Sequence, residues 1–202
     1  MANIKSGVDE SLLTINSISK AARINDHDLR GNFTGQKATY SASTDIKTAT
    51  PASTAVFFAI YGSSSKTIRV HKITICATVA TAAVYGDLIC YKRTAAITGG
   101  TKTDLTQVPL DSQEAAGTAS IVGLYTAAPT PGTGGGVIAS RQAFMPITGT
   151  PAVAIEPIIF SWNTREAESP VLRGIAEGLE ISFATTPGNI PTVTVETIYS
   201  LE

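Results

Sequence analysis

The chain has 202 residues, of which 43% are hydrophobic and 15% are charged, and its formal net charge is -1. This length suits one all-β domain with extensions, and the apolar fraction is large enough to bury a core. Basic and acidic residues number 15 and 16, so no positive field for nucleic acid is expected and we predict no nucleic-acid partner.

The N-terminal sequence MANIKSGVDESLL lacks the basic region and apolar stretch of a signal peptide. No apolar run approaches the roughly 18 residues of a membrane helix, so no membrane partner is expected. We therefore expect a soluble protein made in a reducing cytoplasm. The two cysteines, Cys76 and Cys90, each lie in an apolar, strand-like run. This favours two reduced core thiols, and a disulfide between neighbouring strands remains an alternative.

Residues 1–50 are polar and contain only short apolar pieces. Ser, Thr and Asn are frequent where a helix would need better helix formers, so we predict an extended arm with one or two short strands. Such an arm is ordered by a surface that it lies against. The side chains expected to contact a neighbouring subunit or a lattice are Leu12, Leu13, Ile15, Ile18, Arg23 and Ile24.

The body of the protein is predicted to start at Pro51, before a dense apolar run from Ala55 to Tyr61 that reads as a strand. Further on, Ile68 and Val70 have one parity, whereas Ile73 and Ile75 have the other. This change of phase at His71-Lys72 predicts either a β-bulge or a strand that bends from one sheet to the other.

Further strands are expected over 84–91, 121–125 and 155–162, separated by polar segments. The sequence PTPGTGGG, residues 129–136, predicts an exposed loop tip. Its tip residues are Gly132, Gly134, Gly135 and Gly136.

Near the C-terminus, Leu179, Ile181 and Phe183 alternate with polar residues, which is typical of a half-buried strand. A Pro-Gly turn follows, and Val193, Val195 and Tyr199 resume the alternation, so we predict a terminal hairpin. No segment longer than ten residues has helical periodicity. The whole pattern predicts an all-β, jelly-roll-type sandwich body over residues 51–202, preceded by the arm over residues 1–50.

Few residues suit catalysis, and we expect no enzyme, metal or cofactor. The only histidines are His27, between two aspartates of the arm, and His71 at the predicted bulge. Adjacent residues of an extended chain point in opposite directions, which disfavours a metal site at His27. No G-x-S-x-G sequence supplies a nucleophile beside His71, so a structural hydrogen bond at the bulge is the better interpretation.

Paired carboxylates are the remaining catalytic arrangement, because Glu166 and Glu168 share a parity close to Trp162. A solvated loop explains this run better than a glycosidase does, and a single tryptophan provides few aromatic groups for a sugar cleft. A non-catalytic glycan-binding surface around Trp162, Tyr125 and the glycine-rich loop is kept as an alternative. The GTGGG segment lacks the Lys-Ser/Thr of a phosphate-binding loop.

Three segments resemble a known family: IKSGVDESLLTINSISKAARI, ITGGTKTDLTQVPLDSQEAAGTASIVGLYTAAPT and SPVLRGIAEGLEISF with the strand after it. They are similar to small virion structural proteins of tailed bacteriophages. The first is similar to the motif G-x-D-G-T-L-L-x-E-V-x-x-x-x-K-A-x-R-V and the last to P-x-V-L-R-G-x-x-x-G-L-x-I-N. The chain departs from the family at Glu10, where a turn glycine is usual, and at Ile198-Tyr199, where the family has Trp.

The resemblance implies a capsid decoration or head-fibre protein with a jelly-roll body that forms a homotrimer. The expected partners are the major capsid protein and further copies of the chain. The expected location is the capsid surface of the virion, after synthesis in the host cytoplasm. A tail, baseplate or connector component is the alternative of the same class, and a receptor- or glycan-binding module is the alternative of another class.

Overall fold

The structure, a computed structural model, describes residues 37–45, 48–51, 55–117, 121–149, 155–162, 168–184 and 189–202, together with two short strands nearer the N-terminus. The chain divides into two units, residues 1–37 and residues 38–202. In the first unit, β1 (Thr14–Ile15) pairs antiparallel with β2 (Ala22–Arg23). No other residue before 37 is among those described.

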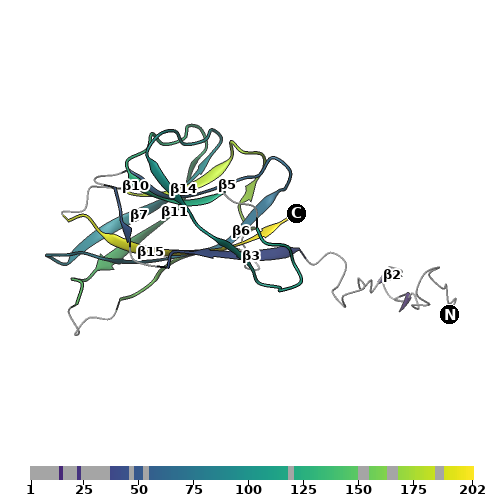
Figure 1. Cartoon of the computed structure of the whole chain (residues 1–202), viewed down its shortest axis with the longest axis horizontal. Helices are drawn as coiled ribbons and strands as arrows, with labels where there is room; N and C mark the ends of the chain where they lie inside the picture. Colours follow the sequence, from purple (N-terminus) through teal and green to yellow (C-terminus); the bar gives the residue numbers. More distant parts are fainter. Residues whose placement is uncertain are drawn as a thin grey trace. The chain divides into compact units, whose positions relative to one another are not determined.

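The second unit is a sandwich of two antiparallel sheets, and its described residues contain no helix (Figure 1). The six-stranded sheet has the order β11-β7-β14-β5-β10-β8. Its strands are β5 (Val56–Tyr61), β7 (Val84–Arg93), β8 (Thr101–Asp104), β10 (Val122–Ala127), β11 (Gly136–Met145) and β14 (Gly178–Phe183). The predicted all-β, jelly-roll-like sandwich is confirmed.

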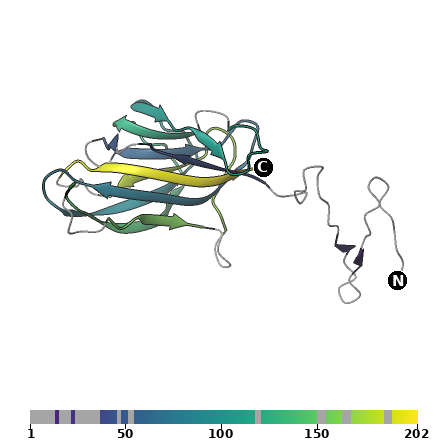
Figure 2. The same ribbon diagram turned by 60° about the horizontal axis from the view of Figure 1, so that its bottom comes forward.

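The second sheet has seven strands, and β15 runs through its middle (Figure 2). The main order is β12-β6-β15-β3-β9, with β13 paired to β6 and β4 paired to β15. The strands are β3 (Ala38–Ser43), β4 (Thr48–Ala49), β6 (Ile68–Thr78), β9 (Gln107–Pro109), β12 (Ile158–Ser161), β13 (Val171–Leu172) and β15 (Thr192–Leu201).

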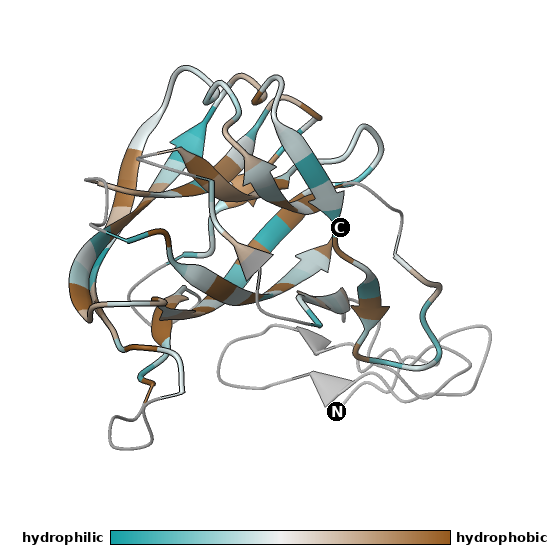
Figure 3. Ribbon diagram, turned by 60° about the vertical axis from the view of Figure 1, so that its left-hand side comes forward, coloured by the Kyte–Doolittle hydropathy of each residue, from teal (hydrophilic) through white to brown (hydrophobic). Residues whose placement is uncertain are grey.

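Hydrophobic stretches lie along the strands of both layers, whereas many of the connecting loops are pale or hydrophilic (Figure 3). Strand β5 is buried along its whole length, because both of its faces are covered. Phe58 and Ile60 belong to the main core between the sheets, whereas Ala59 and Tyr61 form a second small cluster with Tyr125. The six-stranded sheet is thus covered on its outer face at β5 and β10, as well as on its inner face.

The phase change in β6 is a β-bulge. In the pairing with β15, Ile198 lies opposite Lys72 and Tyr199 lies opposite Val70, so His71 is the additional residue. The insertion reverses the parity of the buried positions, as the sequence predicted. The alternative, a strand that bends into the other sheet, is wrong, because β6 remains in one sheet from Ile68 to Thr78.

The predicted C-terminal hairpin is wrong in its pairing. Strand β14 lies in the six-stranded sheet between β7 and β5, and β15 lies in the other sheet between β6 and β3. The segment between them therefore connects the two layers of the sandwich. Strand β14 is also fully buried rather than half-buried, since Glu180 and Ser182 are buried as well as the apolar residues.

The body begins earlier than residue 51. Strands β3 and β4 lie within the predicted arm, yet both pair with β15. In β3, Tyr40 is buried and its ring stacks on that of Tyr199, with 5.8 Å between the centroids. Strands β3 and β4 are therefore part of the sandwich. Alternation in ATYSAS is too short to distinguish such a strand from an arm by sequence.

Candidate functional site

Glu180 is the most unusual side chain of the body, because a carboxylate at the centre of a sheet is 0% exposed. Its Oε1 accepts hydrogen bonds from the Tyr61 hydroxyl at 2.7 Å and from the Gly132 backbone N–H at 3.0 Å. Its Oε2 accepts one from Arg93 Nε at 3.2 Å. Both oxygens and the charge are thus satisfied, as burial of a carboxylate requires.

Two loops cover this carboxylate, one after β7 and one before β11. They bind each other through Thr98 and Thr130, whose backbone N–H groups donate to each other's carbonyl at 3.1 and 2.8 Å. Ala95 N–H also donates to the Thr133 carbonyl at 3.1 Å. Glu180 and this loop pair therefore stabilise each other.

Gly132 lies inside this arrangement and not at an exposed tip. It is buried, and a Cβ placed on it would lie 2.0 Å from the Ala95 carbonyl oxygen. Only glycine allows the two backbones to approach so closely. Gly134, Gly135 and Gly136 are exposed, as predicted, so Gly132 alone of the four glycines departs from the prediction.

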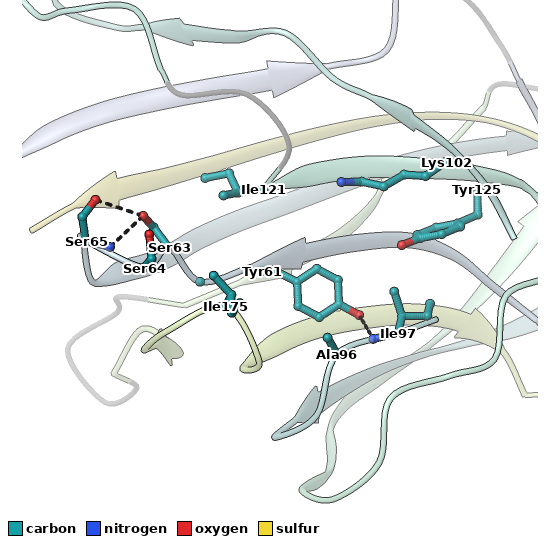
Figure 4. Close-up of a pocket in the computed structure, with 11 residues that line it drawn as sticks. Tyr61, Ser63, Ser64, Ser65, Ala96, Ile97, Lys102, Ile121, Tyr125 and Ile175 are labelled. Carbon is teal, nitrogen blue, oxygen red and sulfur yellow. Dashed lines mark hydrogen bonds between the residues drawn. The ribbon is translucent and has the colours of Figure 1, made fainter. Parts of the chain in front are cut away.

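Tyr61 connects the carboxylate to the second loop, since its hydroxyl accepts a hydrogen bond from the Ile97 N–H at 3.0 Å (Figure 4). Burial raises the pKa of the Tyr61 hydroxyl far above its ordinary value, and the bond to Glu180 adds to the effect. The phenol therefore stays protonated and acts as a donor. Such a saturated network anchors loops and offers no free nucleophile or base.

A pocket of about 520 Å³ adjoins this network on the side of β5, β8 and β10. Its polar walls include Lys102, Tyr125 and the serines of the turn at 63–65, and its apolar walls include Ile97, Ile121 and Ile175 (Figure 4). The Lys102 ammonium lies 2.6 Å from Asp104 Oδ1. The volume lies within the range of small-ligand sites.

His71 makes the structural hydrogen bonds that the sequence predicted. Its Nδ1 lies 3.0 Å from the Ser169 hydroxyl and its Nε2 lies 3.0 Å from the Ser200 hydroxyl. A serine relay needs a carboxylate on one ring nitrogen, whereas both nitrogens of His71 bind serines. Burial lowers the pKa of His71, the Arg69 charge adds to this, and Glu202 opposes it.

This depressed pKa predicts that the protein loses stability on mild acidification. Below the ordinary pKa of 6.5, the unfolded chain binds a proton at this position more readily than the folded protein does. The free energy of unfolding therefore decreases as the pH is lowered. The fall continues until the folded imidazole also protonates. Below pH 6.5, the free energy of unfolding should depend less steeply on pH in His71→Gln than in the wild type. Urea unfolding at a series of pH values measures this slope. His27→Gln is the control, and equal slopes in the two variants would contradict this role of His71.

The predicted carboxylate pair is not tested, since Glu166 lies outside the described residues. Tyr125 and Trp162, two of the three features proposed for a glycan surface, lie in different surroundings. Tyr125 is 3% exposed within the small cluster, whereas Trp162 stacks on Phe160, with 6.3 Å between the ring centroids, beside the main core. Tyr125, and not Trp162, lines the pocket.

Both cysteines are free thiols. Cys90 is buried in β7, and burial raises the pKa of its thiol to about 12. Cys76 is half-buried in β6 of the other sheet. The expectation of two core thiols thus holds fully for Cys90 and in part for Cys76.

The predicted arm contacts fall mostly outside the described residues. This applies to Leu12, Leu13, Ile18 and Ile24, and also to His27. Ile15 and Arg23 lie in β1 and β2, where only the backbone pairing is described. Their expected role in contacts with a neighbour therefore remains a prediction.

No family model, curated protein or solved structure matches this chain. Within the described ranges, no helix is long and apolar enough to cross a membrane. Among the same residues, no three His, Cys, Asp or Glu side chains gather as a metal ion would require.

Proposed function

We propose that this chain is a non-enzymatic structural protein of a tailed-bacteriophage virion, a capsid decoration protein that acts as a homotrimer. The observation that supports self-association is the free edge of β11. This ten-residue strand pairs with β7 on one side, and no described strand pairs with its other side. A long free edge is an unused row of backbone hydrogen-bonding groups.

The side chains of β11 favour burial of this edge against another chain. Arg141 is its only charged residue, and a bulge at Ile138 is its only irregularity. Val137 is 55% exposed, Ile138 40% and Phe144 38%. Monomeric proteins usually protect such a strand with several charges or a proline, so we propose a second copy of the chain as its partner.

Neighbouring β7 extends the apolar surface of this edge. Tyr85 is 66% exposed and lies opposite Phe144 in the strand pairing, with 5.1 Å between the ring centroids. Two exposed aromatic rings already in contact need little ordering when a partner covers them. The β11 edge, defined as Val137, Ile138 and Phe144 with Tyr85, is therefore the proposed subunit contact.

The virion assignment rests on the three sequence segments that resemble phage structural proteins. In this proposal the arm residues Leu12, Leu13, Ile15, Ile18, Arg23 and Ile24 bind the major capsid protein or a neighbouring copy. A trimer at a three-fold or quasi-three-fold position would connect adjacent capsid subunits. Many weak contacts repeated over the shell would then oppose the pressure of packaged DNA.

The mass of the full chain in solution tests the subunit contact. Light scattering after gel filtration should give the mass of three chains, and Ile138→Lys should shift the population towards monomers by placing a charge in the interface. Ile190→Lys is the matched control, because Ile190 is 55% exposed outside the β11 edge. A monomeric wild-type protein, or equal masses for the two variants, would overturn the proposed contact.

Attachment to particles tests the virion role. Deletion of residues 1–24 should lower the occupancy on capsids, and full occupancy of the truncated protein would refute anchoring by the arm. Electron microscopy of particles carrying the labelled chain gives its place. A label on the tail would favour the alternative, a tail, baseplate or connector component.

A further inference from the structure

The pocket beside Glu180 is lined by a tyrosine hydroxyl that bonds to none of the described residues. Tyr125 is 3% exposed, and none of the described residues hydrogen-bonds its hydroxyl. Figure 4 shows this hydroxyl directed into the space that the lining side chains surround. A hydroxyl that opens onto a pocket from a largely buried side chain is held in place and is available to bond a ligand there.

The charges around the pocket are balanced. Lys102 forms its ion pair with Asp104 at 2.6 Å, and Arg93 forms one with Glu180 at 3.2 Å. The lysine stem lies flat over β10 because Gly123 has no side chain there. With each cation matched by a carboxylate, the site has no excess of positive charge for a phosphate or carboxylate ligand.

The opposite end of the pocket adds further hydroxyl groups. Ser63 Oγ accepts a hydrogen bond from the Ser65 N–H at 3.3 Å and lies 3.4 Å from the Ser65 hydroxyl. Ser64 lines the pocket beside them. These serines belong to the turn that follows β5, so neighbouring residues of one turn place several donors and acceptors in a row.

Apolar walls stand between the two polar ends. Ile97 and Ile121 are half-buried, and Ile175 at the opening is 68% exposed. A ligand that fits must therefore present hydroxyl groups to both ends and C–H groups to the middle. Sugar rings have this combination, with hydroxyls around the rim and C–H groups on the faces.

We propose that this pocket binds a neutral sugar unit of a glycan, with the Tyr125 hydroxyl as its central hydrogen-bonding group. The burial of Tyr125, the balanced charges and the row of serines carry the proposal. Burial raises the pKa of the Tyr125 hydroxyl to about 12, so the group is protonated and able to donate at neutral pH. This binding activity is independent of the proposed place in the virion.

The experiment uses the full chain and a panel of neutral oligosaccharides built from glucose, galactose, mannose or N-acetylglucosamine. Titrations followed by NMR should shift the amide signals of residues 62–65 and of Ile97. Glucuronate and inorganic phosphate serve as anionic probes and should bind more weakly than the neutral sugar. No shift with any neutral member, or tighter binding of an anion, would overturn the proposal.

Variants of single hydroxyl groups locate the site. Tyr125→Phe keeps the ring in its cluster and should weaken binding about tenfold, the loss expected for one unmade hydrogen bond to a buried group. Tyr85→Phe removes an exposed hydroxyl elsewhere and should bind as the wild type does. Ser64→Ala changes an exposed position of the same pocket, so it tests the site even if Tyr125→Phe does not fold. Unchanged affinity in both pocket variants would refute the site.

Discussion

Glu180→Ala should lower the free energy of unfolding by about 3–5 kcal/mol, the usual cost of removing one partner of a buried ion pair. The change leaves the Arg93 charge, the Tyr61 hydroxyl and the Gly132 N–H without their acceptor. Arg93 retains 18% of its side-chain exposure, so partial hydration limits the loss. Chemical denaturation of both proteins under identical conditions measures the difference.

Glu196→Ala is the control for the loss of a glutamate in an ion pair. Glu196 is 44% exposed and lies 3.9 Å from Lys72, so its removal should cost less than about 1 kcal/mol. Hydrogen exchange at the Gly132 N–H should also become faster in Glu180→Ala, because its acceptor is gone. Equal destabilisation by the two variants would refute the anchoring role of Glu180.

The second large effect is expected at Tyr199, which is 0% exposed near the C-terminal end of β15. Tyr199→Ala removes a large core side chain, its stacking on Tyr40 and its hydrogen bond to Gln107 Oε1. A loss of about 3–5 kcal/mol is typical of truncating an aromatic core residue. Thermal and urea unfolding both report this change.

Tyr199→Phe separates the ring from its hydroxyl group. It keeps the stacking and should cost about 1 kcal/mol for the lost hydrogen bond. A double-mutant cycle of Tyr199→Ala with Tyr40→Ala should give a coupling of about 0.5–1.5 kcal/mol between the two rings. No coupling would contradict the conclusion that residues 38–43 stabilise the body.

Some features of the fold were accessible from the sequence because they depend on neighbours in the chain. The bulge at His71 could be predicted, since one inserted residue reverses the parity of buried positions within a single strand. A structural hydrogen bond of His71 was predicted because no nucleophile motif accompanies it, and both ring nitrogens have serine partners. The strand at 56–61 was clear from its dense apolar run.

Other features depended on distant segments and could not be predicted. Alternation in LEISF indicates a strand with a polar face. Glu180 is nevertheless buried, because the loops after β7 and before β11 cover it. The only available signal was a glutamate between apolar residues of a strand. The pairing of β14 and β15 with different sheets is likewise a long-range choice, because a short turn permits either a hairpin or a crossing between layers.

By itself, then, the sequence determined the class of the protein: alternating apolar residues and turn-forming residues act locally, and together they specify an all-β sandwich. Tertiary structure alone decided which strands pair, where the body begins and which polar groups are buried. The physical reason is that hydrogen-bonding partners such as Glu180 and Gly132 lie far apart in the chain. Their contact exists only after two sheets and two loops have come together.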